Sequence, residues 1–204
     1  MVGRSGLILT PDVPTVQAGA AGAGSPDDDR TIATHILNRH AIAMSTFLDA
    51  IDVIDHAAGL APGDPLHGAR RFRVKVVEAT QASHDALLLQ PVDGFSPADR
   101  LRVAAHVCTL AGAASLERHY ADRLADAPDR DEPSSPALPA MLTFAAKLTT
   151  DPRLGDRAAI DALKRAGLGD AAIVALAQLV AFLSYQLRVV AGLKAMRAGQ
   201  EGTR

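Results

Sequence analysis

The fold is decided by residues 96–124, which read SPADRLRVAAHVCTLAGAASLERHYADRL. Ser96 can cap a helix, Pro97 suits the first helical position, and Asp99 adds a carboxylate to the first turn. Together they predict a helix that continues to about Ala111, where the glycine that follows breaks it. A second helix occupies the rest of the stretch, so a helical hairpin is predicted.

Apolar residues recur at helical spacing in five further parts of the sequence. These parts are residues 30–59, 74–89, 140–148, 156–166 and 170–198. No stretch of alternating apolar and polar residues bounded by turn signals is typical of a strand. The sequence therefore predicts an all-α fold, a helical bundle that ends in a long buried C-terminal helix.

Composition suggests how the chain is divided. Residues 1–30 have too little periodic apolar content to offset the entropy of ordering, so they are predicted to be a flexible leader. Residues 31–198 are predicted to form one domain, with the core hairpin at 96–125. Four prolines mark a surface linker at 127–139, and residues 199–204 form a tail.

Charge and composition exclude several classes of partner. A formal net charge of -2, 3% aromatic residues and no tryptophan provide neither a phosphate-binding surface nor a base-stacking platform, so no nucleic acid is expected. Residues 171–190 are apolar, but they contain polar side chains that are costly in hydrocarbon, namely Gln178, Ser184, Gln186 and Arg188. No membrane partner is expected, and burial in a core or an oligomer interface is predicted instead.

Cys108 is the single cysteine, which rules out an intrachain disulfide. No secretory signal begins at Met1, so a cytoplasmic location is expected. Cys108 lies on the apolar side of its predicted helix, where a cysteine is usually a small inert hydrophobe, although a reactive thiol is the alternative. His106 is two residues away and points roughly in the opposite direction, so the two side chains cannot pair on one helix.

Ser115 and His119 are a candidate catalytic pair, because residues four apart share a face of a helix. The sequence contains no nucleophile elbow, no recognisable oxyanion hole and no carboxylate obviously placed to orient the imidazole. The alternative interpretation is structural, with a small serine at the start of a helix and a histidine at a helix interface or surface.

Asp49, Asp52 and His56 fall on one helical face and could bind a divalent metal, although a solvated acidic face is the ordinary explanation. The sequence has no HExxH, no repeated Glu and His pairs at helical spacing, and no CxxC with downstream partners. It also has no glycine-rich phosphate loop between a strand and a helix. No metal and no cofactor are predicted.

Residues 96–124 resemble the core hairpin of the carboxymuconolactone decarboxylase and alkylhydroperoxidase D superfamily. Residues 144–152 (FAAKLTTDP) and 162–193 (ALKRAGLGDAAIVALAQLVAFLSYQLRVVAGL) resemble the closing half of its peroxidase-related members. The resemblance covers roughly residues 71–196. It includes three side chains at positions where such members commonly carry a glutamine, an aromatic residue and an arginine, namely Gln178, Phe182 and Arg188.

The resemblance also implies where a site would lie. In this superfamily a CxxC begins the second hairpin helix, a histidine follows four residues later, and an acidic residue lies on the first helix. His119 matches the histidine, while Gly112 and Ser115 hold the cysteine positions. The acid falls at Arg100, with Asp99 beside it.

The first functional expectation is therefore a peroxidase-related oxidoreductase of peroxiredoxin type without its dithiol, in which redox activity is lost or altered. The resemblance also implies a homo-oligomer, a trimer or hexamer. One alternative is a non-redox, decarboxylase-like enzyme on a small carboxylated or lactone substrate, with His119 moving the proton. In that case His106, Arg100 or Arg188 could bind the substrate. The other alternative is a non-catalytic oligomeric binding or scaffold protein.

Overall fold

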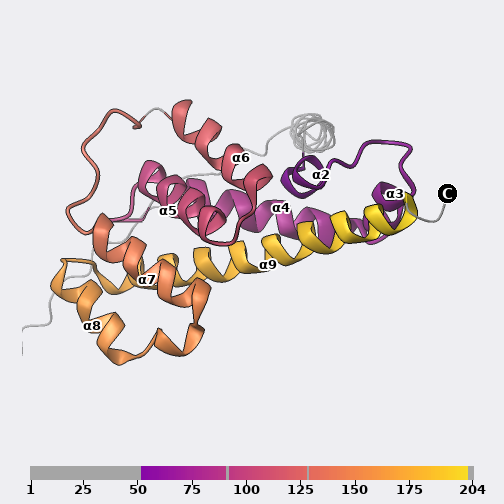
Figure 1. Cartoon of the computed structure of the whole chain (residues 1–204). Coiled ribbons are helices and arrows are strands. Elements are labelled where there is room, and N and C mark those ends of the chain that lie inside the picture. Colours follow the sequence, from indigo (N-terminus) through magenta and orange to yellow (C-terminus); the bar gives the residue numbers. More distant parts are fainter. Residues whose placement is uncertain (1–51, 91, 128, 202–204) are drawn as a thin grey trace, which may run out of the picture. The chain divides into compact units, whose positions relative to one another are not determined.

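The computed structural model describes residues 52–90, 92–127 and 129–201 (Figure 1). All the regular secondary structure within these residues is helical, so the predicted all-α fold is confirmed for the described part of the chain. The predicted leader at 1–30 lies outside the described residues, and so does Asp49 of the candidate metal group.

The elements follow one another along the chain as short and long helices. They are α2 (Val53–Ala58), α3 (Pro65–Arg71), α4 (Val74–Leu89), α5 (Pro97–Leu110), α6 (Ala114–Ala125), α7 (Leu138–Thr150), the 3-10 helix η1 (Pro152–Leu154), α8 (Arg157–Arg165) and α9 (Asp170–Glu201).

Most of these bounds lie close to the predicted ones, and α4 coincides with the predicted stretch. Of the predicted stretch 30–59, residues 30–51 lie outside the described residues, and α2 forms its end. The sequence predicts neither η1 nor α3, because Pro65 in the run APGDP reads as a stop signal. In the structure Pro65 is the first helical residue of α3 instead. The Asp64 carboxylate caps this helix by accepting a hydrogen bond from the Leu66 amide at 2.9 Å.

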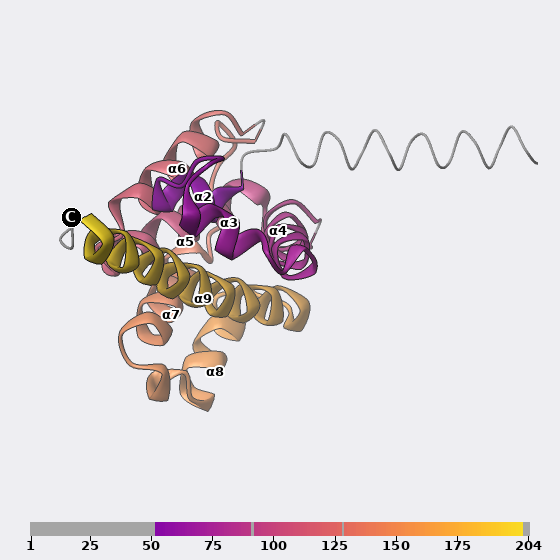
Figure 2. The ribbon, with the colours of Figure 1, turned by 90° about the vertical axis from the view of Figure 1, so that its right-hand side faces the viewer.

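The packing is organised around α9. This helix contacts α2, α4, α5, α7 and α8, and Figure 2 shows it between α7 and α8 on one side and the remaining helices on the other. Leu176, Leu179 and Leu183 on one face of α9 are buried in the core. Val174 and Tyr185 are 55% and 41% exposed, so α9 is buried along one face only. Length and composition alone would also allow α9 to cross a membrane.

The hairpin of α5 and α6 is closed by local geometry. Ser96 caps α5 as predicted, and Gly112 adopts φ of 65° directly after the helix ends. The Gly112 amide donates to the Thr109 carbonyl at 3.0 Å, and the Ala113 amide donates to the Cys108 carbonyl at 2.9 Å. These two bonds form a Schellman motif, which requires the left-handed conformation that glycine adopts without strain.

A buried ion-pair cluster joins α2 to α3. The Asp55 carboxylate accepts from Arg70 at 2.8 Å and from Arg71 at 2.9 Å, and Asp52 accepts from Arg70 while capping α2. Both aspartates are at least nine-tenths buried. Because buried charges depend on their partners, these contacts fix the angle between two helices that are each too short to be stable alone.

Replacing Asp55 by alanine removes the only ion pair that Arg71 forms within the described residues and leaves Arg70 with its bond to Asp52. We expect the Asp55→Ala protein to lose about 3 kcal/mol of unfolding free energy, as breaking a buried pair does. Urea denaturation measures this value. The matched control is Asp131→Ala, since the Arg130–Asp131 pair is exposed on both sides and should contribute almost nothing. Equal effects of the two substitutions would contradict this assignment.

Candidate functional site

The turn between α5 and α6 opens into a surface pocket of ≈ 460 Å³, here called the hairpin-turn pocket. Ser115 lines it, and its hydroxyl accepts a hydrogen bond from the Lys194 ammonium at 2.8 Å. A second cation, Arg188, lines the α9 side. The full lining is Ala111, Gly112, Ala113, Ala114, Ser115, Leu187, Arg188, Val190, Ala191 and Lys194.

His119 lies one turn further along α6 than Ser115 but has different neighbours. Its ring lies 6.0 Å from the ring of His84 on α4, measured between centroids, and 5.1 Å from the ring of Tyr120. No hydrogen bond joins His119 to Ser115 in the described part of the chain. The structure therefore pairs His119 with a second imidazole, and His84 and His119 are here called the histidine pair.

His84 is the imidazole that a carboxylate orients. Its Nδ1 lies 2.9 Å from Oδ1 of Asp85, which also accepts a hydrogen bond from the Gln81 amide at 3.0 Å. An ionised carboxylate only accepts, so Nδ1 of a neutral His84 carries the proton and Nε2 presents a lone pair. The Nε2 atoms of His84 and His119 are both buried and have no hydrogen-bond partner. Such atoms are uncommon in folded proteins and call for an explanation.

Burial keeps both imidazoles neutral. Burial, together with smaller effects of the neighbouring His84 and Arg123, lowers the pKa of His119 to about 4. Burial also lowers the pKa of His84, against the opposing effect of the Asp85 carboxylate. The histidine pair therefore consists of two uncharged rings near neutral pH.

Tyr120 and α9 form one wall beside the histidine pair. The Tyr120 ring is stacked on His84 at 6.1 Å, and its hydroxyl donates to the Gln186 side-chain oxygen at 2.6 Å. Burial raises the pKa of Tyr120, which keeps the hydroxyl protonated. Phe182, one of the residues singled out by the resemblance, has its ring centroid 6.3 Å from that of His84. Gln178, another of these residues, is exposed.

Cys108 is completely buried in the core. Burial raises the pKa of the Cys108 thiol to about 12, with a further contribution from Glu117, so the thiolate is negligible near neutral pH. His106 is half-buried on the same helix, and its ring forms no hydrogen bond or ion pair with the described residues. The structure brings neither residue into the histidine pair.

Asp99 and Arg100 are buried at the start of α5 and have structural contacts. The Asp99 carboxylate accepts from Arg102 at 2.9 Å and from the Ser135 amide at 3.0 Å, which ties α5 to the segment before α7. The Arg100 guanidinium donates to the Leu87 carbonyl in the last turn of α4, where a cation is favourable. The position at which the resemblance implies an acid thus holds a helix-capping cation.

The described residues contain no group of three or more His, Cys, Asp and Glu side chains that could hold a metal ion. Asp52 of the candidate metal group caps α2 and pairs with Arg70, and His56 is exposed.

No protein-family model matches the sequence, and no curated protein matches it. Solved structures that are similar to the chain include the following two. One is described as an uncharacterized peroxidase-related protein from Silicibacter sp. TM1040, with 22% identity and a TM-score of 0.49 over 72% of this chain and 82% of its own.

The other is described as an alkylhydroperoxidase AhpD core and an uncharacterized peroxidase-related protein from Ralstonia eutropha JMP134. It has 24% identity and a TM-score of 0.43 over 59% of this chain and 70% of its own. Likenesses at this level assign neither activity nor site residues, so the site depends on the geometry of this chain alone.

Sequence reasoning includes His119 and Ser115 but misses the partners that the structure gives them. His84 and Asp85 are adjacent in a predicted helix, which is a possible signal for a carboxylate-oriented imidazole. Lys194 gives no comparable signal, because it is 79 residues from Ser115.

The neutral burial of His119 predicts a specific dependence of stability on pH. Its pKa is about 4 in the folded protein and near 6.5 when unfolded, so on acidification the unfolded chain takes up the proton first. The unfolding free energy should therefore fall as the pH decreases from about 6.5 toward 4, with this residue contributing on the order of 2 kcal/mol between pH 7.5 and 5.

Urea unfolding at the two pH values measures this difference. The His119→Gln protein should lose less stability on acidification than the wild type, and the control His106→Gln should behave like the wild type. An unchanged pH difference in His119→Gln would show that this imidazole is not held neutral by burial.

Proposed function

We propose that this chain is a member of the carboxymuconolactone decarboxylase and alkylhydroperoxidase D superfamily that works without a thiol. In this proposal the histidine pair moves a proton on a small carboxylated or lactone substrate. The observation that carries the proposal is the pair of buried, unpartnered Nε2 atoms of His84 and His119. The expected location remains the cytoplasm.

The state of the thiol supports the loss of dithiol chemistry. Exchange with a peroxide or a disulfide requires an accessible thiolate, and Cys108 is neither accessible nor ionised near neutral pH. The two positions at which the resemblance implies cysteines hold Gly112, which forms the turn, and Ser115, which cannot form a sulfenate.

The imidazoles supply groups for acid–base chemistry. His84 presents a lone pair at Nε2 because Asp85 holds its Nδ1 proton, and it takes up a proton from the carbon next to the substrate carbonyl. The C–H electron pair becomes an enolate, which His119 stabilises as a neutral hydrogen-bond donor, and the proton then returns to the product. Perturbed titratable groups of this kind concentrate at functional sites.

The nearby charges favour an anionic substrate. Lys194 and Arg188 on α9 line the hairpin-turn pocket and can attract a carboxylate. Ser115, which lines the same pocket, lies one helical turn before His119 on α6. Arg123, one turn beyond His119, has no ion-pair partner in the described part of the chain and adds positive charge close to both rings.

Solvent deuterium exchange tests the proposal. Small carboxylated γ-lactones and β-keto acids are incubated with the protein in deuterated buffer, and loss of the proton next to the carbonyl is followed by NMR. We expect catalysed exchange that falls at least about 100-fold in His84→Gln and in His119→Gln, the usual size of a general acid–base contribution.

His106→Gln and Cys108→Ala are the matched controls and should keep the wild-type exchange rate. Circular dichroism and thermal unfolding confirm that each variant is folded. Deuterium exchange that survives in both His84→Gln and His119→Gln would contradict thiol-independent chemistry at the histidine pair. Hydroperoxide turnover that disappears in Cys108→Ala would contradict it as well.

We also propose that the chain forms a homo-oligomer, a trimer or hexamer as the resemblance implies, through the exposed face of α9. Val174, Ala181 and Tyr185 are exposed and seven and four residues apart, so they form one apolar stripe. Sedimentation velocity should show an oligomer that Val174→Glu dissociates and the control Ala158→Glu, on the exposed side of α8, does not. A wild-type protein that sediments as a monomer at every concentration would contradict this.

A further inference from the structure

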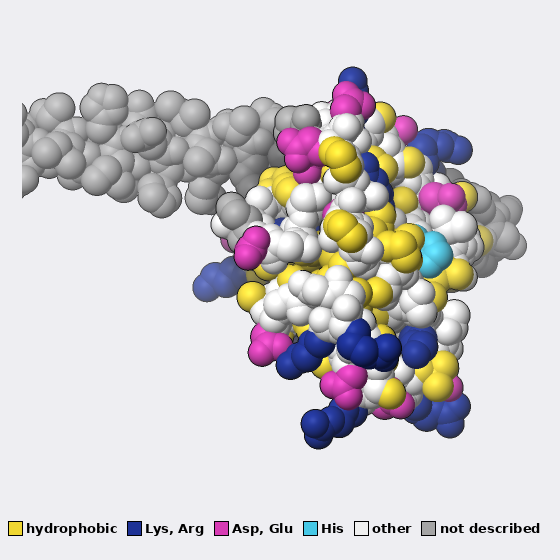
Figure 3. All heavy atoms as spheres, turned by 90° about the vertical axis from the view of Figure 1, so that its left-hand side faces the viewer, with side chains coloured by type: hydrophobic (Ala, Val, Ile, Leu, Met, Phe, Trp, Pro, Cys, Tyr) yellow, Lys and Arg dark blue, Asp and Glu magenta, His cyan; other side chains and the backbone are white. Residues whose placement is uncertain are grey.

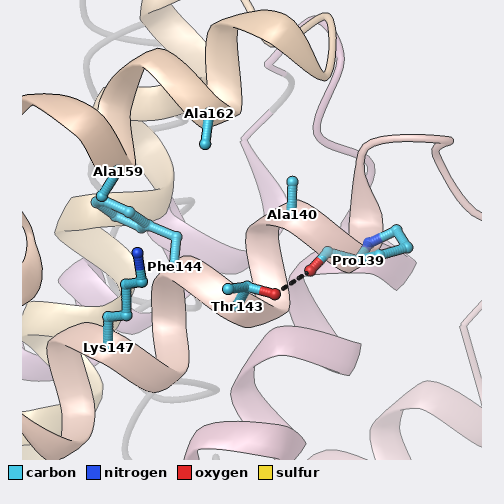
Figure 4. Close-up of a pocket in the computed structure, with 7 residues that line it drawn as sticks. All are labelled: Pro139, Ala140, Thr143, Phe144, Lys147, Ala159 and Ala162. Atoms are coloured by element: carbon cyan, nitrogen blue, oxygen red, sulfur yellow. Dashed lines mark hydrogen bonds between the residues drawn. The ribbon is translucent and has the colours of Figure 1, made fainter.

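The helices α7 and α8 enclose a surface hollow that is separate from the histidine pair. Figure 2 shows these two helices on the opposite side of α9 from α4 and α6. The hollow has a volume of ≈ 310 Å³ and is shown in Figure 4. Its lining is Pro139, Ala140, Thr143, Phe144, Lys147, Ala159 and Ala162.

Small side chains create the hollow. Ala159 and Ala162 on α8 face Ala140 on α7, and Phe144 lies between the two helices with only 4% of its surface exposed (Figure 4). Gly155, in the turn that joins the helices, packs closely against the Leu148 side chain, with which a Cβ atom at this position would collide. The small side chains of the alanines leave a gap between α7 and α8.

Lys147 is the only charged residue of the lining, and its ammonium forms no hydrogen bond or ion pair with the described residues. Figure 4 shows its side chain extending toward Phe144 and Ala159. The Thr143 hydroxyl donates to the Pro139 carbonyl at 2.9 Å, so its proton is already used. The hollow thus combines apolar walls with a single unpaired positive charge.

We propose that this hollow binds a medium-chain monocarboxylate, with the carboxylate at Lys147 and the hydrocarbon against the alanines and Phe144. We choose this class of ligand for two reasons. Its anionic head group can pair with the Lys147 ammonium, and its methylenes can pack against the alanine methyl groups and the Phe144 ring. At roughly 30 Å³ for each water-sized group, the volume accommodates on the order of ten non-hydrogen atoms, the number in octanoate. A partner helix, about 10 Å across, is too wide for this space.

The surrounding surface also favours an anion. Figure 3 shows Lys and Arg side chains gathered on the lower half of the face that contains α8, with acidic side chains among them. On α8 itself, Arg157 pairs with Asp161 and Lys164 with Asp170, whereas Arg165 is exposed and has no ion pair in the described part of the chain. The positive charges of Lys147 and Arg165 attract carboxylates toward the hollow and should make binding weaker at high salt.

Titration calorimetry with saturated monocarboxylates of four to twelve carbons tests the proposal. We expect the affinity to rise about two- to fourfold for each added methylene while the hollow fills, and then to level off near octanoate. Octanol and octylamine, which have the same chain without the negative charge, should bind more weakly than octanoate. Equal affinity for all three head groups would overturn the role of Lys147.

Two variants locate the binding site. Lys147→Met keeps the apolar stem and should weaken octanoate roughly threefold without changing octanol, as expected for a solvent-exposed ion pair. Ala162→Leu fills the hollow and should abolish the binding of both ligands. Lys164→Met is the matched control, because Lys164 lies on α8 outside the lining and pairs with Asp170.

Thermal unfolding of each variant shows whether it is folded. Octanoate that binds Ala162→Leu as tightly as the wild type would overturn the proposal, and so would an absence of chain-length dependence. Deuterium exchange at the histidine pair does not involve α7 or α8, so the result here is independent of the proposed function.

Discussion

Burial of one face of α9 is the constraint on which the rest of the structure depends. Leu176, Leu179 and Leu183 form an apolar surface that the other helices cover from two sides, and burial of large aliphatic side chains is the principal stabilising term in such a bundle. The same helix supplies Gln186, which holds the Tyr120 hydroxyl beside the histidine pair, and Lys194, which holds Ser115. The helix α9 therefore provides both the packing of the core and the contacts that position Tyr120 and Ser115.

Burial in the core also sets the protonation state of Cys108, His84 and His119. Complete burial removes the Cys108 thiol from solvent and keeps it protonated, so it behaves as a small apolar side chain. The same low-polarity interior keeps the two imidazoles neutral while leaving one nitrogen of each without a partner. Burial thus keeps the thiol and both imidazoles in their uncharged forms.

The two sides of α9 have different properties. On one side the Tyr120 ring lies against both members of the histidine pair, and its hydroxyl is hydrogen-bonded to Gln186. This hydrogen bond favours a fixed position of the ring beside the two imidazoles. On the other side α7 and α8 meet through alanines and leave a hollow open to solvent. The hollow follows from the small size of the alanine side chains that line it.

The sequence by itself determined the helices and the hairpin, because caps, apolar periodicity and the glycine at position 112 act over a few residues. It failed at α3, where one proline reads equally as a stop and as a first helical residue. Only the tertiary structure decided that His119 faces His84 and that Ser115 meets Lys194. Such contacts depend on how whole helices pack, and no local pattern specifies the angle at which α4 and α9 cross α6.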